Sequence, residues 1–86
     1  MPVVKFYAGL RKVAGVKEMT VPGRNIRLVL ETLAIEIPGM RAFFPDGERA
    51  RVIISLNGHT LDLQTALDIP VSEQDEIAIF PPIAGG

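Results

Sequence analysis

The sequence predicts one α+β domain of 86 residues, in which a mixed sheet of four to five strands packs on one main helix. Residues 3–8 and 76–80, near the two ends, are rich in β-branched and aromatic residues and place apolar side chains on both faces, which is typical of buried β-strands. Between these ends, residues 26–37 repeat apolar side chains at the helical period of roughly 3.6. A chain of this length cannot build a second hydrophobic core, so we expect a single domain spanning residues 1–86.

The amino-terminal part predicts a hairpin. In residues 3–8, β-branched and aromatic side chains alternate between two apolar faces, which indicates a central strand. In residues 16–22, Met19 and Val21 are expected to point inward. The connection between these strands, LRKVA, lies between two glycines and is long enough for one helical turn.

The helical segment has a clear start and a clear end. Asn25 is suited to cap its first turn, because the side-chain oxygen can accept from an unpaired backbone N–H. Pro38 and Gly39 are expected to stop it. Residues 40–50 contain two phenylalanines and are interpreted as an excursion packed through these aromatic side chains. The inward face of the helix consists of Ile26, Val29, Leu30, Leu33 and Ile37.

The remaining strands close the sheet. Residues 52–56 form a strand that meets Asn57-Gly58, a strong signal for a type I′ hairpin turn and a short returning strand. Residues 61–69 indicate a short helical or irregular crossing, and residues 76–80 the last strand. One helix covers one face of such a sheet. The most economical closure places the last strand beside the first, in parallel, which is the β-grasp arrangement.

Composition excludes several classes of function. Nine Lys and Arg residues balance ten Asp and Glu residues, so the chain lacks the positive charge typical of proteins that bind nucleic acid or membrane surfaces. There is no cysteine, and the lone His59, expected as an exposed turn residue, cannot form a metal cluster unaided. No apolar run approaches the roughly 18 residues of a membrane span. We therefore expect a soluble, cytoplasmic protein that binds neither nucleic acid nor membrane.

The sequence ends in PPIAGG, residues 81–86, which we interpret as an extended tail. Prolines end the last strand because they lack a backbone donor and fix φ. Residues without side chains allow the end of the tail to enter a narrow tunnel. The ionised carboxylate of Gly86 can attack the α-phosphorus of ATP, but the chain has no phosphate-binding loop, so a partner must bind the nucleotide. The residues expected to thread are Pro81, Pro82, Ile83, Ala84 and Gly85.

Three motifs carry a resemblance to a known family. The ending FPPIAGG, the opening VKFYAGLRKVAG and the LNG turn before EIAIF resemble the small subunits of molybdopterin synthase, within the MoaD/ThiS family of ubiquitin-like β-grasp sulfur carriers. The resemblance spans nearly the whole chain. Thiamine-pathway carriers of this family are usually shorter and lack the Phe-Pro-Pro lead. Residues 39–51 and 80–82 therefore favour the molybdopterin branch.

The resemblance implies a cycle of activation and sulfur transfer. An E1-like enzyme adenylates the Gly86 carboxylate with ATP, and a persulfide donor converts it to a thiocarboxylate. The carrier then docks on the large synthase subunit and donates its sulfur to a cyclic pterin precursor, building the dithiolene of the molybdenum cofactor. In this cycle the chain binds no cofactor and is a non-catalytic subunit, because the active site lies on the partner.

The resemblance also assigns a partner surface. Phe80 and Ala78 face away from the helix, where family members bind the large subunit and the E1-like enzyme, unless Phe43 or Phe44 folds over them. Arg11 sits where the family often keeps an arginine near the tail. Three alternatives stay open: a ubiquitin-like modifier joined through Gly86 to lysines, a sulfur carrier for thiamine synthesis or tRNA thiolation, and an interaction module without tail chemistry.

Overall fold

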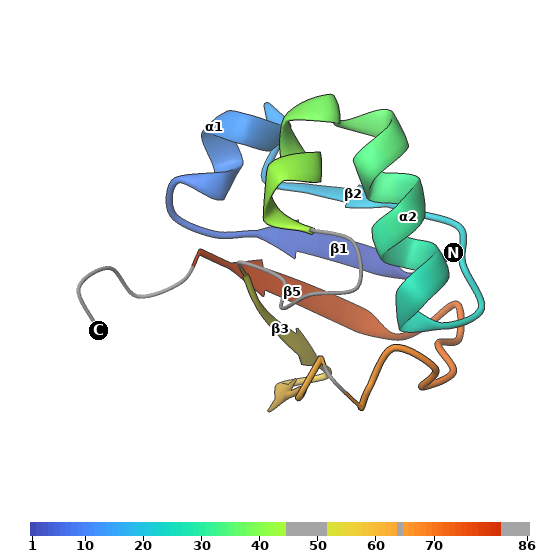
Figure 1. The fold of residues 1–86 in the computed structure, drawn as a ribbon. Helices are drawn as coiled ribbons and strands as arrows, with labels where there is room; N and C mark the ends of the chain where they lie inside the picture. The colour runs from blue at the N-terminus through green and yellow to red at the C-terminus, as the bar shows by residue number, and fades with distance from the viewer. Residues whose placement is uncertain (45–51, 64, 82–86) are drawn as a thin grey trace.

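The computed structural model describes residues 1–44, 52–63 and 65–81, and Figure 1 shows the arrangement of its elements. These described residues form five strands and three helical segments. In order they are β1 (Val3–Phe6), α1 (Leu10–Ala14), β2 (Glu18–Thr20), α2 (Ile26–Glu36), the 3-10 helix η1 (Pro38–Phe43), β3 (Ile53–Leu56), β4 (His59–Thr60) and β5 (Glu76–Phe80).

The strands form one mixed sheet in the order β2-β1-β5-β3-β4. The last strand, β5, lies beside β1 in parallel, with Val4 opposite Ile77 and Phe6 opposite Ile79. Its other neighbour, β3, pairs with it antiparallel. The β-grasp arrangement predicted from the sequence is therefore confirmed, including the parallel pairing of the two terminal strands.

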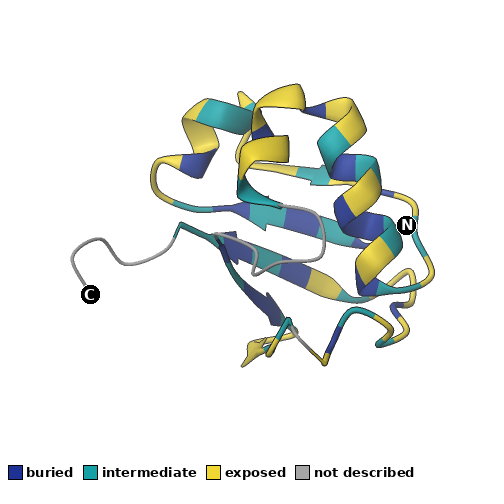
Figure 2. Ribbon diagram, viewed as in Figure 1, coloured by how far each residue is buried: buried dark blue, intermediate teal, exposed yellow. Residues whose placement is uncertain are grey.

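The helical segments lie on one face of this sheet, and the buried residues gather between the two layers (Figures 1 and 2). β1 and β5 send every second side chain into this layer, which is why Val4, Phe6, Ile77 and Ile79 are at most 1% exposed. Leu33 of α2 meets them from the other side and is fully buried. The apolar face predicted for residues 26–37 is thus the face that covers the sheet.

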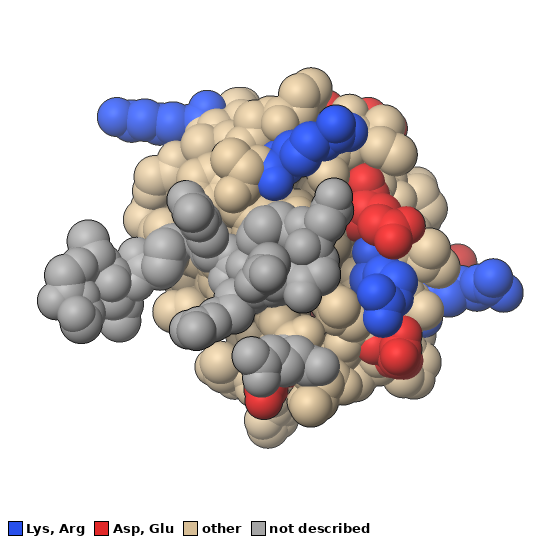
Figure 3. Space-filling view, viewed as in Figure 1, with Lys and Arg blue, Asp and Glu red and all other residues tan. Residues whose placement is uncertain are grey.

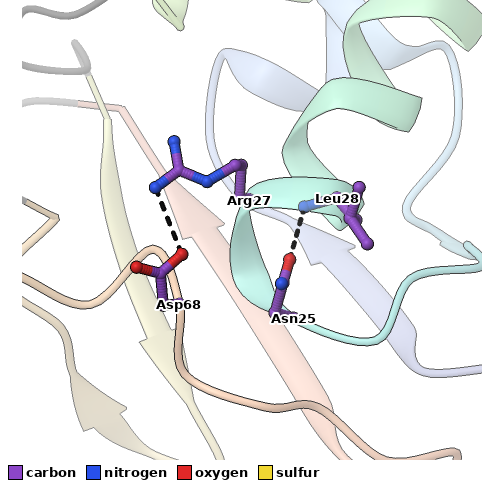
Figure 4. Close-up of polar contacts among 4 residues, drawn as sticks. All are labelled: Asn25, Arg27, Leu28 and Asp68. Atoms are coloured by element: carbon purple, nitrogen blue, oxygen red, sulfur yellow. Dashed lines mark hydrogen bonds and ion pairs between the residues drawn. The ribbon is translucent and has the colours of Figure 1, made fainter.

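The amino-terminal end of α2 is fixed by two polar contacts (Figure 4). The Asn25 side-chain oxygen accepts a hydrogen bond of 2.9 Å from the backbone N–H of Leu28, as predicted for an N-cap. The Arg27 guanidinium meets the Asp68 carboxylate at 3.2 Å. This pair ties the first turn of α2 to the irregular crossing that residues 61–69 were expected to form.

Three strands are shorter than predicted; the strand expected over residues 52–56 begins at Ile53. The first ends at Phe6 instead of residue 8, because Ala8 has a φ of 52° and turns the chain into α1. The left-handed conformation costs a residue with a Cβ roughly 1 to 2 kcal/mol, so the sequence gives no sign of it. The second strand covers Glu18–Thr20 only, although Met19 and Val21 do point towards the core.

Of the excursion predicted over residues 40–50, the structure describes residues 40–44, which lie largely in a 3-10 helix, and residues 45–50 are outside the described residues. Pro38 ends α2 but begins η1, consistent with the tolerance of proline at the first position of a helix. Met40 in η1 is fully buried, a core position that the sequence pattern does not predict. Phe43 and Phe44 are half-buried and pack against the core cluster, as expected.

The predicted hairpin turn after β3 is confirmed. Asn57 and Gly58 have φ values of 50° and 86°, the positive values that a type I′ turn requires at both central positions. His59 is exposed but belongs to the short strand β4, not to the turn itself. None of the helices in the part of the chain that the structure describes is long and apolar enough to cross a membrane.

Candidate functional site: the end of β5 and the open face of the sheet

The sheet face opposite the helices, called here the open face, carries the candidate site. It is made by the side chains that alternate with the core positions of the three middle strands. β5 runs along its centre, and the chain leaves β5 at Pro81, which is half-buried. The open face consists of Val3, Lys5, Tyr7, Ile53, Ser55, Glu76, Ala78 and Phe80.

Phe80 and Ala78 lie on this face as predicted, and both are partly exposed. The sequence left open whether Phe43 or Phe44 folds over Phe80. In the structure both pack against the core instead. On its β3 side, Phe80 is opposite Ile53 in the antiparallel register. The site is thus an apolar strip at the point where the chain leaves the sheet.

On the β1 side, Phe80 stacks on Tyr7. Their ring centroids are 4.6 Å apart and the ring planes differ by 13°. The parallel register explains this contact, because Phe6 lies opposite Ile79 and the Tyr7 backbone N–H donates to the Ile79 carbonyl at 3.1 Å. Both rings therefore lie on the open face, each one residue beyond the last residue pair between β1 and β5.

Arg11 reaches the same place from α1. Its Nε–H donates to the carbonyl oxygen of Phe6 at 3.0 Å, and its guanidinium carbon lies 5.7 Å from the centre of the Tyr7 ring. This distance falls within the range of a cation–π interaction. The resemblance placed Arg11 near the tail. In the structure the Tyr7 ring contacts both Arg11 and Phe80 and so connects them.

A charged pair lies on the open face near the start of β5. Lys5 Nζ lies 2.8 Å from the Glu76 carboxylate, and both side chains remain substantially exposed. The hydrogen bond to Glu76, together with the negative charge of that group, raises the pKa of Lys5 above its ordinary value. An exposed pair of this kind contributes little to stability, and it joins β1 to β5 on the open face.

The opposite end of β5 is held by a polar network. Asn57 donates from its backbone N–H to the Glu76 carbonyl and accepts on its side-chain oxygen from the Glu76 N–H, both at 2.8 Å. Its amide group also donates to Asp75 at 2.9 Å, while the Ser72 N–H donates to the other Asp75 oxygen at 2.7 Å. These two bonds, that from Ser72 first, lower the pKa of Asp75.

Most of the predicted tail is outside the described residues. The structure describes Pro81, directly after β5, whereas the positions expected to thread and react are not described. These positions are Pro82, Ile83, Ala84, Gly85 and Gly86. The described part of the site is therefore the surface around Phe80 and Pro81.

Other kinds of site find no support in the described ranges. Among residues 1–44, 52–63 and 65–81, no group of three or more His, Cys, Asp or Glu side chains could hold a metal ion. On the face of the molecule in Figure 3, positive and negative side chains are interspersed instead of forming one broad region of a single sign. The open face and the end of β5 thus remain the candidate site.

Tyr7 is the site residue that sequence reasoning missed. It alternates with the core residues Val4 and Phe6, which places it on the open face, but the sequence alone assigns it no role. The available signal was the combination of two predictions. A parallel pairing of the first and last strands, aligned at their carboxyl ends, brings Tyr7 beside Phe80.

Comparisons with known proteins agree with this architecture. The family model described as the ThiS family matches residues 4–86. Comparison with curated protein sequences found no match.

Similar solved structures include two archaeal proteins. The small archaeal modifier protein 1 from Methanosarcina acetivorans is 29% identical, with a TM-score of 0.86 over 99% of this chain and 95% of that chain. The protein of the same name from Haloferax volcanii is 30% identical, with a TM-score of 0.75 over 99% and 98%.

A third similar structure is a complex of subunits 1 and 2 of the molybdopterin-converting factor from Helicobacter pylori. The matching chain is 22% identical, with a TM-score of 0.65 over 99% of this chain and 97% of that chain. At this identity the similarity concerns the fold alone.

Proposed function

The chain belongs to the ThiS family, and we propose that it acts as a sulfur carrier whose working group is the carboxylate of Gly86. In this role an E1-like enzyme adenylates the carboxylate with ATP, and a persulfide donor converts it to a thiocarboxylate. Adenylation is needed because a carboxylate oxygen is a poor leaving group and AMP is a good one. The chain supplies the carboxylate and the docking surface, and its partners supply the nucleotide site and the sulfur.

One observation carries this proposal above the others. The last strand lies at the centre of the sheet, paired on both sides, and one of its faces is left uncovered by the three described helical segments. A tail that follows such a strand can be inserted into a partner while the domain remains folded, because the core lies on the other side of the sheet. The family match supports the same reading, since it extends through residue 86.

We further propose that the sulfur acceptor is the cyclic pterin precursor of molybdopterin, held by a large synthase subunit. The Phe-Pro-Pro sequence at residues 80–82 and the long segment at residues 39–51 support this branch. In the Helicobacter complex a chain of the same fold is paired with a second subunit, which supports a partner protein for this chain. In this proposal the large subunit and the E1-like enzyme bind the open face through Phe80 and Ala78, with Arg11 beside them.

The experiment that tests the working group is intact-mass spectrometry. The protein is incubated with an E1-like enzyme from the same genome, ATP and a persulfide donor. The product is expected to have gained one sulfur atom and lost one oxygen atom. Deleting Gly86, or adding one residue after it, is expected to abolish the change without altering the thermal unfolding temperature. An unchanged mass with every E1-like enzyme of that genome would refute the proposal and favour a simple interaction module.

A second candidate function is a protein modifier joined through Gly86 to lysines. It is favoured by the two archaeal modifier proteins, which are 29% and 30% identical to this chain. Both functions use the same adenylation step, so the products distinguish them. Sulfur transfer to the pterin precursor on the large subunit supports the carrier, whereas isopeptide adducts on other proteins' lysines without pterin activity support the modifier.

The partner surface is tested by Phe80→Ala. Apolar interface anchors cost about 2 kcal/mol or more when they are truncated, so the variant is expected to lose co-purification with the large subunit. The Phe80 side chain lies outside the core, so thermal unfolding should stay cooperative. If Phe80→Ala unfolded the domain, Phe80 would be a structural residue and this surface would need to be reassigned.

A further inference from the structure

We propose that Tyr7 is a positioning residue, which presets Phe80, and with it the departure of the tail at Pro81, for insertion into the E1-like enzyme. This inference rests on the proposed function, because it concerns how the carrier presents its tail. It differs from the partner surface described above, since it assigns to Tyr7 a role that is exerted through Phe80 and not by contact with the partner.

The geometry supports a preset ring. A partly exposed phenylalanine side chain at the end of a strand can sample several rotamers, and fixing one of them on binding costs affinity. Here the Phe80 ring already lies nearly parallel to the Tyr7 ring at 4.6 Å. On its other side, Phe80 is opposite Ile53 in the sheet. Phe80 is therefore flanked on both sides before any partner arrives.

Tyr7 is in turn held by its own neighbours. Its backbone N–H donates a hydrogen bond of 3.1 Å to the Ile79 carbonyl, which fixes the position of the Tyr7 backbone relative to β5. The Arg11 guanidinium lies 5.7 Å from the centre of the Tyr7 ring. The Arg11 Nε–H in turn donates to the Phe6 carbonyl. The three side chains thus form an ordered series, Arg11, Tyr7 and Phe80, that leads to the residue before Pro81.

The turn between β1 and α1 places Arg11 beside Tyr7. Ala8 adopts a φ of 52°, which a residue with a Cβ rarely does. The turn is closed by hydrogen bonds from the Leu10 and Arg11 N–H groups to the Tyr7 and Ala8 carbonyls, both at 3.1 Å. It brings α1 back so that Arg11 meets the end of β1. Strained backbone of this kind is concentrated at functional sites.

The free protein offers a direct test of the stack. Tyr7 is the only tyrosine, so its ring signals in a proton NMR spectrum can be assigned without ambiguity. Phe80→Leu is expected to move these signals downfield, because the ring current of the stacked phenylalanine is lost. Phe43→Leu, which removes an aromatic ring that packs against the core instead, is the matched control and should leave them in place. Unchanged signals in Phe80→Leu would overturn the proposal.

Enzyme kinetics then test the role of Tyr7. In adenylation assays with an E1-like enzyme of the same genome, Tyr7→Leu is expected to raise the KM for this protein about two- to tenfold, with kcat unchanged. Tyr7→Phe keeps the ring and should restore the original KM. A loss in Tyr7→Phe as large as in Tyr7→Leu would show that the hydroxyl contacts the enzyme, against the proposal.

A double-mutant cycle separates positioning from direct contact. If Tyr7 acts through Phe80, then Tyr7→Leu has no further effect on KM in a Phe80→Ala background. Additive effects would show that Tyr7 contacts the enzyme independently, and would overturn the proposal. Absence of turnover with every E1-like enzyme would instead refute the proposed function, and the NMR comparison would still decide whether Tyr7 positions Phe80.

Discussion

Leu33→Ala tests the packing of α2 on the sheet, on which the rest of the fold depends. Leu33 is fully buried and faces the core positions of β1 and β5. Truncating a buried leucine to alanine costs about 2 to 5 kcal/mol, because apolar surface is lost and a cavity is left. The full burial of Leu33 places the expected cost towards the upper part of this range. For a domain of this size, each 1 kcal/mol lowers the unfolding midpoint by about 4 to 8 °C.

The assay is thermal unfolding followed by circular dichroism, with Ile35→Ala as the matched control. Ile35 lies two residues farther along the same helix and is 70% exposed. Its truncation should change the free energy of unfolding by less than about 0.5 kcal/mol. Leu33→Ala should therefore lower the midpoint by about 10 °C or more, and Ile35→Ala by far less. Equal losses in the two variants would show that the helix covers the sheet with a different face.

Three further perturbations address single contacts. Gly23→Ala should destabilise the protein by about 1 to 3 kcal/mol in urea unfolding, because a Cβ at Gly23 would lie 2.6 Å from Val29 Cγ2 and 2.9 Å from the Val29 backbone nitrogen; unchanged stability would show that this approach is looser. Asn25→Ala should cost about 1 kcal/mol through loss of the helix cap, and Asn25→Ser should recover most of it; equal stability of both variants would argue against a capping role. The lowered pKa of Asp75 predicts a contribution to stability that is fully present above its ordinary pKa of 3.8 and is lost as the pH falls through the lower folded value. In acid titrations of unfolding, Asp75→Asn should therefore lose less stability on acidification than the original protein, and identical pH profiles would exclude this contribution.

Local signals in the sequence predicted the fold where short-range chemistry decides it. The Asn57-Gly58 turn needs two residues that tolerate positive φ, and Asn25 needs only a side-chain oxygen three residues before a free N–H. The parallel pairing of β1 with β5 followed from a different kind of argument, namely that a single helix leaves one economical way to close the sheet. These predictions depend on pattern and on topology, both of which a single sequence contains.

Other features depend on tertiary contacts that no local pattern reveals. The first strand stops early because Ala8 turns into the left-handed region, and alanine gives no hint of such a turn. Met40 becomes a core residue only because η1 folds back after α2. At the candidate site, Phe80 and Arg11 were recognised, but the ring that connects them was not, because their contact with Tyr7 depends on the exact register of strands far apart in the sequence.

In the proposed function, the central position of β5 lets the folded domain present its tail to more than one partner. A partner that draws the tail into a pocket pulls on Pro81 and therefore on β5. This strand is paired with β1 on one side and β3 on the other, so a pull along it acts in shear on two ladders at once. Asn57 holds the Glu76 backbone at the far end through both its N–H and its carbonyl. At the near end, Tyr7 holds Phe80. Since the core lies on the opposite face, we expect the proposed insertion of the tail to leave the buried layer under α2 intact.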